Sequence, residues 1–363
     1  MQLKVSTCGS NAKGQLGIQS FEDISIPTLV TIKHEPISTN NNYTACAGGS
    51  NHTILAINGQ LYVCGDNSKG QLGIETDHTT IFIPSDLKIP VKFIACGWDS
   101  SFVITNEGDV YGCGDNTFGT VGIRKQKLAI WENLLIPNVV KISCGMRHTL
   151  FLLEDGSVLG CGSSRKGSLL CDVKDIHWIP FQLQFRQRVL DIACGQFHSV
   201  VLMESHQVYV FGRNQYGQLG ISPDQISFSI NPIRIDLHEN YIPYSIESSW
   251  STIGIVCKEG EVVIWGRCDR FQTGIPVDMN KKFQVTPQVI PHLKVKKLVF
   301  GSEHAIALSS DGTAVTWGWN EHGNCGLGHL IDVSTFTKLQ IQLPEVTDIG
   351  SGAGHSIIIH KEV

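Results

Sequence analysis

The chain has 363 residues, with 28 lysines and arginines against 33 aspartates and glutamates, and its formal net charge is −5 at pH 7. Its basic residues are scattered, and the densest group, Lys294, Lys296 and Lys297, is too small to follow a phosphate backbone, so we expect no direct nucleic-acid ligand. No apolar run reaches membrane-spanning length and the first residues lack a secretory pattern, which predicts a protein of the cytoplasm or nucleus without membrane contact.

Two short sequence words alternate along the chain. The first is rich in glycine and reads Cys8-Gly9-Ser10-Asn11-Ala12-Lys13-Gly14-Gln15-Leu16-Gly17, with further copies opening at Cys64, Cys113, Cys161, Phe211, Trp265 and Trp317. The second is Gly-x-x-His-Ser/Thr, with the histidine at His52, His148, His198, His304 and His355, and with Ser100 and Ser251 assigned to the same place in the other copies. Both words recur about every fifty residues, which indicates a repeat protein.

Each repeat is predicted to contain short strands. In one copy, strands at 92–95 and 101–105 precede the turn Asn106-Glu107-Gly108-Asp109, and a third strand follows at 110–113. Glycine in such a turn supplies the positive φ that a tight hairpin requires. About four strands per repeat, without helical spacing of the apolar residues, favour a blade of an all-β propeller over a helical solenoid.

The two ends of the chain carry complementary half-repeats. The chain begins with a glycine-rich word at Cys8 and ends with Gly352-Ala353-Gly354-His355-Ser356. Joined, the halves complete one blade and leave no exposed sheet edge. We therefore predict a seven-bladed β-propeller, closed by pairing the N- and C-terminal strands in one blade, that forms a single domain over residues 1–363.

The repeated residues are expected to be structural. None of the glycine-rich words has the Gly-x-x-x-x-Gly-Lys-Ser/Thr form of a phosphate loop, and the cysteines and histidines lack the close pairing of a metal site, so we expect neither cofactor nor metal. The cysteines are predicted to be buried packing residues, and the histidines to bond the backbone of a neighbouring strand or blade. Ser302, His304 and Asp311 resemble a hydrolase triad on paper, but their repeat counterparts argue against it, and no catalytic residue is assigned.

The combination of Asn-x-x-Gly-Gln-Leu-Gly with Gly-x-x-His-Ser/Thr in seven copies resembles the regulator-of-chromosome-condensation repeat family over essentially the whole chain. That family includes an exchange factor for a small GTPase, a plant light receptor and ubiquitin-ligase modules, so its fold alone does not decide a function. Two stretches resemble a narrower group, which contains the fungal alpha-tubulin suppressor and the animal secretion-regulating guanine nucleotide exchange factor. They are Cys96-Gly97-Trp98-Asp99-Ser100, and Gly301-Ser302-Glu303-His304 together with the word at 317–326.

In the fungal branch, this resemblance implies a protein that is not an enzyme. It implies a partner of a small zinc-ribbon electron carrier that supports diphthamide synthesis on elongation factor 2 and Elongator-dependent tRNA wobble-uridine modification. The alternative is guanine nucleotide exchange on a small GTPase. For guanine nucleotide exchange, the longer connections after Ile74, Ile123, Ile221 and Ile275 are candidate elements for disturbing a bound nucleotide. The longest, from Ile221 to Glu247, is a candidate partner-binding loop, but a plain linker is the favoured interpretation.

The unusual residues of these two stretches are the predicted partner-binding site. Trp98 and Trp319 present large amphipathic surfaces at low rotamer cost, and acidic side chains supply a polar rim for a basic partner or one rich in backbone contacts. The predicted contact residues are Trp98, Asp99, Glu303, His304, Trp319, Glu321 and His322. Packing of the tryptophans between blades, with the acids capping local turns, is the alternative for each residue taken singly.

Overall fold

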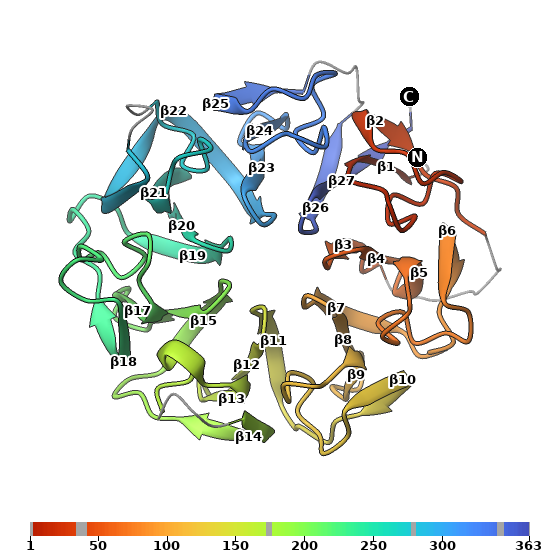
Figure 1. Ribbon diagram of the computed structural model, residues 1–363, viewed down its shortest axis with the longest axis horizontal. Helices are drawn as coiled ribbons and strands as arrows, with labels where there is room; N and C mark the ends of the chain where they lie inside the picture. Colours follow the sequence, from red (N-terminus) through yellow and green to blue (C-terminus); the bar gives the residue numbers. More distant parts are fainter. Residues whose placement is uncertain (1–2, 34–41, 172–175, 277–280, 340–344, 363) are drawn as a thin grey trace.

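A computed structural model describes residues 3–33, 42–171, 176–276, 281–339 and 345–362. Within these ranges the chain is all-β apart from a single 3-10 turn, η1 (Arg165–Gly167). Figure 1 shows the blades arranged around one axis, with the first strand of each blade innermost and the last strand outermost. The predicted propeller is confirmed.

The strands of each blade run antiparallel and pair in chain order. Blade 1 contains β3 (Ala45–Gly48), β4 (His52–Ile57), β5 (Gln60–Asp66) and β6 (His78–Pro84). Blade 2 contains β7 (Val91–Cys96), β8 (Ser100–Thr105), β9 (Val110–Asp115) and β10 (Lys127–Asn133). Blade 3 contains β11 (Val139–Cys144), β12 (His148–Leu153), β13 (Val158–Ser163) and β14 (Ile176–Leu183). Blade 4 contains β15 (Val189–Cys194), β16 (His198–Met203), β17 (Val208–Arg213) and β18 (Phe228–Arg234).

Blades 5 and 6 share one long strand. Blade 5 contains β19 (Pro243–Ser248), β20 (Thr252–Cys257), β21 (Glu261–Arg267) and the first part of β22 (Phe283–Phe300). From Val295 onward, β22 becomes the inner strand of blade 6 and pairs with β23 (His304–Ser309), which is followed by β24 (Ala314–Gly318) and β25 (Val333–Lys338). The stretch from Ile221 to Glu247, expected to be a connection, holds all of β18 and most of β19, so only its two short irregular parts join strands.

The last blade closes the ring. Its strand order is β2 (Ile24–Leu29), β1 (Leu3–Gly9), β27 (His355–Lys361) and β26 (Val346–Ser351). β1 and β27 pair without a break from Leu3 opposite Lys361 to Gly9 opposite His355, and both chain ends lie at this blade in Figure 1. The predicted closure by the two ends of the chain is confirmed.

Neighbouring blades bury their apolar faces against each other. Between blades 2 and 3, for example, Phe102 and Phe151 meet edge to face with ring centroids 6.1 Å apart, and both are fully buried. The first residue of the glycine-rich word packs against the preceding blade. Trp265 and Trp317 are also fully buried there, and their indole N–H groups donate to backbone carbonyls at 2.8 and 2.9 Å. The cysteines that occupy the same place, such as Cys64, are buried as predicted.

The repeated histidines connect adjacent blades through side chains rather than through the backbone, which corrects the prediction. In each case Nε2 lies 2.8–3.1 Å from a hydroxyl of the next blade. The pairs are His52 with Ser101, His148 with Ser199, His198 with Ser248, His304 with Ser356 and His355 with Thr53. A hydroxyl serves here because it accepts from the ring N–H and donates its own proton to a backbone carbonyl, as Ser101 does to Gln71.

The glycine of this word is required by the histidine three residues later. A Cβ on Gly301 would lie 2.1 Å from Cε1 of His304, because the imidazole ring packs directly over the glycine. In blade 5 both the glycine and the histidine of this word are replaced. Thr252, and not Ser251 as the sequence suggested, begins β20 and pairs with Gly266 as the histidines pair with their glycines, while Ser249 replaces the glycine. Without an imidazole ring, this turn has room for a side chain.

Candidate functional site

The turns of the Gly-x-x-His words gather around the axis on one face of the ring. Backbone hydrogen bonds join turn to turn, as from Trp250 N–H to Ser302 O at 3.2 Å and from Ser302 N–H to Ala353 O at 2.9 Å. A similar bond of 2.8 Å joins Ser50 N–H to the carbonyl of Trp98. We call this face the tryptophan face, because two of its turns carry tryptophan. The bonds between turns hold this face as a rigid platform.

Trp98 of blade 2 and Trp250 of blade 5 meet at the axis. Their ring centroids are 5.1 Å apart and the ring planes are inclined by 40°. Both side chains are partly exposed. Blades 2 and 5 stand on opposite sides of the ring in Figure 1, so the two indoles reach toward each other over the centre of the platform.

Beside this pair the tryptophan face is hollowed. The hollow, which we call the tryptophan pocket, has a volume of about 460 Å³. Its lining comes from blades 1, 2, 5, 6 and the closing blade: Ser10, Ser50, Asn51, Trp98, Trp250, Arg267, Arg270, Ser302, Glu303, Trp319, His322, Ala353 and Gly354. Its size lies within the range of pockets that bind ligands or single partner side chains.

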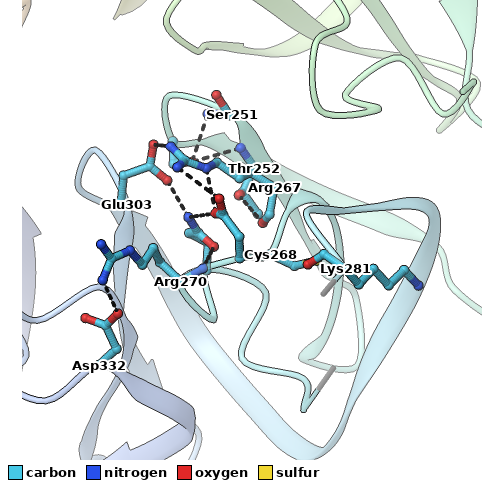
Figure 2. A network of polar contacts seen from close by, with 11 residues as sticks. Ser251, Thr252, Arg267, Cys268, Arg270, Lys281, Glu303 and Asp332 are labelled. Carbon is cyan, nitrogen blue, oxygen red and sulfur yellow. Dashed lines mark hydrogen bonds and ion pairs between the residues drawn. The ribbon is translucent and has the colours of Figure 1, made fainter. Parts of the chain in front are cut away.

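A network of charged side chains forms one wall of the pocket. Figure 2 shows Arg267 at the end of β21, where its backbone N–H donates to Ser251 O and its carbonyl accepts from the Thr252 hydroxyl. The guanidinium donates to both carboxylate oxygens of Asp269, at 2.7 and 3.1 Å, and to Glu303 at 2.8 Å. Such forked bonds fix the plane of the guanidinium.

Glu303 is the most enclosed acid of this wall, with 9% of its surface exposed. Its second carboxylate oxygen accepts from the side-chain amide of Gln272 at 2.7 Å. Burial raises the pKa of Glu303, against the opposing effect of Arg267. Burial also acts to raise the pKa of Asp269, but hydrogen bonds from Arg267 and Gln272 outweigh it and the pKa is lowered.

Trp319 and His322 form a further part of the lining, and the backbone N–H of Trp319 donates to the carbonyl of Glu303 at 3.0 Å. The rings of Trp319 and His322 meet edge to face with centroids 5.2 Å apart, and the imidazole Nδ1 lies 2.6 Å from Asp23 of the closing blade. The indole N–H of Trp319 donates to Glu321 at 3.2 Å. Glu321 is exposed, so its carboxylate remains open to solvent beside the indole.

The structure brings most of the predicted contact residues together. Four of them, Trp98, Glu303, Trp319 and His322, line the tryptophan pocket. The other two acids stand at its edge: Glu321 holds the Trp319 indole, and Asp99 accepts from the hydroxyl of Ser50 at 2.8 Å. Burial raises the pKa of Asp99, partly offset by that hydrogen bond.

His304 does not fit the prediction. It is 1% exposed and lies behind the platform, where it bonds Ser356 of the next blade. A partner on the tryptophan face does not reach it, and its burial follows from the packing of its ring over Gly301.

Trp250, Arg267 and Arg270 were not expected in the site. Trp250 had a signal in the sequence, since it occupies the same turn position as Trp98 in a second copy that lacks the histidine. The two arginines had none, because their place beside Glu303 depends on how blades 5 and 6 pack. No group of three or more His, Cys, Asp or Glu side chains within the described ranges is arranged to hold a metal ion. Nor do those ranges contain a helix with the length and apolar character that crossing a membrane requires.

Comparison with known proteins gives the family. Residues 4–358 match the family described as RCC1-like domain. The chain belongs to this family. It is 30% identical to the secretion-regulating guanine nucleotide exchange factor of Mus musculus, over 97% of this chain and 82% of that protein. It is also 30% identical to an RCC1 repeat-containing protein of Schizosaccharomyces pombe, over 92% of each.

The same fold is found among solved structures. Prp20p of Saccharomyces cerevisiae, described in a study of its binding to Gsp1p and histones, superposes with a TM-score of 0.87 at 22% identity, over 99% of this chain and 92% of that one. At this level of identity the likeness concerns the fold. The family resemblance inferred from the repeated words is therefore confirmed.

These comparisons correct the expected function. The role as a partner of a zinc-ribbon protein in diphthamide synthesis and Elongator-dependent tRNA modification is wrong, since two relatives that match 97% of the chain, from Mus musculus and Bos taurus, are named secretion-regulating guanine nucleotide exchange factors. The expectation that the protein is not an enzyme is wrong for the same reason, because exchange factors are catalysts. It rested on the resemblance to the fungal branch and on the assignment of no catalytic residue, such as a nucleophile with its base, which nucleotide exchange does not require, since the reaction forms no covalent bond.

Proposed function

We propose that this protein is a guanine nucleotide exchange factor for a small GTPase. The observation that carries the proposal is the similarity, along nearly the whole chain, to proteins named for that activity. A catalyst of exchange binds the nucleotide-free GTPase more tightly than the nucleotide-bound form and thereby lowers the barrier to nucleotide release. It needs an extended and rigid contact surface rather than a set of reacting groups.

The tryptophan face offers such a surface. Its turns are fixed to one another by backbone hydrogen bonds, and its three partly exposed indoles have two χ angles each, so little conformational freedom is lost on binding. Aromatic residues clustered near the centre of a surface and surrounded by polar groups are typical of the residues that dominate binding energy. We therefore propose this face as the GTPase-binding face.

The test is nucleotide release from purified small GTPases of the same organism, taken from the cytoplasm and nucleus. Each GTPase is loaded with fluorescent GDP, and release is followed in excess GTP with the protein present at a tenth of the GTPase concentration. We expect one GTPase to release GDP at least about tenfold faster, a gain that needs only about 1.4 kcal/mol of differential binding. If no GTPase of the panel responds, and none forms a complex in its nucleotide-free form, the proposal is wrong.

The binding face is tested by a matched pair of variants. Combined substitution of Trp98→Ala and Trp319→Ala is expected to abolish most of the acceleration. Tyr244→Ala removes a large aromatic residue, 68% exposed, near the start of β19, whereas the turn that carries Trp250 follows the end of this strand, and we expect it to leave exchange unchanged. If Tyr244→Ala abolishes the acceleration and the tryptophan double variant keeps it, the GTPase binds the other face.

A further inference from the structure

The tryptophan pocket combines aromatic walls with an excess of negative charge. Three partly exposed indoles line it, those of Trp98, Trp250 and Trp319. The face of an indole attracts cations through its quadrupole, and tryptophan is the strongest of the aromatic side chains in this respect. The pocket therefore has walls suited to a cation.

Its two arginines are already neutralised by neighbours. Arg267 bonds Asp269 and Glu303, as described above. Arg270 forms an ion pair of 3.0 Å with Asp332, which is itself held by the backbone N–H of Asn320. Neither guanidinium is left to attract an anion into the pocket.

The acids around the pocket outnumber the bases in the described part of the chain. Six carboxylates lie in or beside it, and two arginines and His322 stand against them. The carboxylates are those of Asp23, Asp99, Asp269, Glu303, Glu321 and Asp332. Around Asp99 one further base, Lys69, is outnumbered by the two further acids Asp66 and Asp115. A cation that enters gains from the indole faces and from this excess at once.

We propose that the tryptophan pocket receives a lysine or arginine side chain of the bound GTPase. The proposal rests on the function proposed above and names the chemistry of the contact. The alkyl part of such a side chain lies against the indoles, while its charged end is directed to the carboxylates at the rim. Glu321 is the best placed of these, since it is exposed and bonded to the edge of Trp319. The net charge of −5 also favours a partner with a basic contact region.

The first experiment needs no GTPase. The indole N–H signals of the ¹⁵N-labelled protein are followed by NMR during titration with N-acetyl-arginine amide, N-acetyl-lysine amide and the neutral N-acetyl-norleucine amide, with assignment by Trp→Phe variants. We expect saturable shifts of the signals of Trp98, Trp250 and Trp319 with the two cations, and shifts at least about fivefold smaller with norleucine amide. The signal of buried Trp131 serves as the internal control.

The role of charge is tested in the same titration. Glu321→Gln keeps the shape of the side chain and its contact with Trp319, and we expect it to weaken the apparent affinity for the cations about threefold or more without changing the response to norleucine amide. Equal responses to charged and neutral probes, or no saturable response to the cations, would overturn the proposal.

Comparison with the exchange assay separates the two proposals. If GDP release is accelerated but the indoles do not respond to the cations, the pocket proposal fails and the exchange function stands. If the indoles bind the cations but no GTPase responds, the exchange function fails, and the pocket remains a cation-binding site whose partner is not a GTPase. In a responsive GTPase, Glu321→Gln is further expected to slow association and to reduce its dependence on salt.

Discussion

Trp98 and Trp250 stack over the axis of the propeller, with ring centroids 5.1 Å apart, although they belong to blades on opposite sides of the ring. The contact joins two blades that share no strand, so it depends on how the whole ring is assembled. It therefore reports on closure as well as on the binding face.

We predict that Trp98→Ala and Trp250→Ala are coupled in stability. Aromatic pairs in such arrangements contribute about 0.5–1.5 kcal/mol beyond the area they bury, so the double variant should lose less stability than the two single losses together, by about that amount. Urea unfolding of the four proteins in a double-mutant cycle measures it. Trp98→Ala combined with Trp319→Ala is the control, since Trp319 meets the ring of His322 edge to face instead, and there the losses should add. Additive losses for Trp98 and Trp250 would show that the stack contributes nothing in solution.

The glycine and histidine of each turn are predicted to behave as a pair. Gly301→Ser places a side chain against the ring of His304, and overpacking of this kind costs about 1–3 kcal/mol. Adding His304→Thr reproduces the combination found naturally as Ser249 and Thr252 in blade 5, and should restore part of the lost stability. Thermal unfolding of the wild type and the three variants measures the effect. A double variant no more stable than Gly301→Ser would contradict the steric explanation.

The sequence predicted the ring because the repeat is local. The spacing of the words, the glycine turns and the complementary ends each depend on residues close together in the chain, and together they specify blades and their closure. The site was predicted only in part. Trp98 and Trp319 stand out as unusual residues in repeated words, but their neighbours Trp250 and Arg267 enter the site through contacts between blades, which no local pattern reveals. The position of Thr252 was missed because Ser251, which Thr252 follows, fits the order His-Ser/Thr of the word equally well.

The function was less accessible to sequence reasoning for a physical reason. Nucleotide exchange requires differential binding of two states of a partner, and the residues that provide it need no particular chemical class. The absence of a nucleophile and base therefore carries no information about it. A network such as that of Arg267, Asp269 and Glu303 becomes visible only when the blades are assembled.

That network leads to a prediction about two arginines. Arg267→Lys cannot maintain the forked bonds to Asp269 together with the bond to Glu303, and bonds to charged groups contribute about 1.5–3 kcal/mol each, so we expect a loss of stability of that order. Arg270→Lys is the matched control. Its side chain is 54% exposed and makes a single ion pair with Asp332, so its loss should stay below about 1 kcal/mol. Urea unfolding compares them, and equal losses would show that the network of Arg267 adds no stability.

The buried histidines predict the response of the protein to acid. Burial lowers the pKa of His52, His148 and His304 to about 4, and that of His198 and His355 to about 3, from an ordinary value of 6.5. Below about pH 6.5 these histidines therefore bind protons in the unfolded chain but stay neutral in the folded chain. The stability that these histidines contribute is complete above that pH and is lost as the pH falls toward 4, at about 1.4 kcal/mol per pH unit for each histidine.

We expect His304→Thr to make the free energy of unfolding less dependent on pH, by the contribution of one histidine. Glu247, whose pKa is raised by burial, acts in the opposite direction on pH-dependent stability, but it is common to both proteins and cancels in the comparison. Urea unfolding at a series of pH values between 6.5 and 5 gives the slope for each, and the variant should be shallower by about 1.4 kcal/mol per pH unit below pH 6. Identical slopes would mean that His304 accepts a proton without unfolding, and that its bond to Ser356 survives in the charged form, with Nε2 donating to the serine hydroxyl.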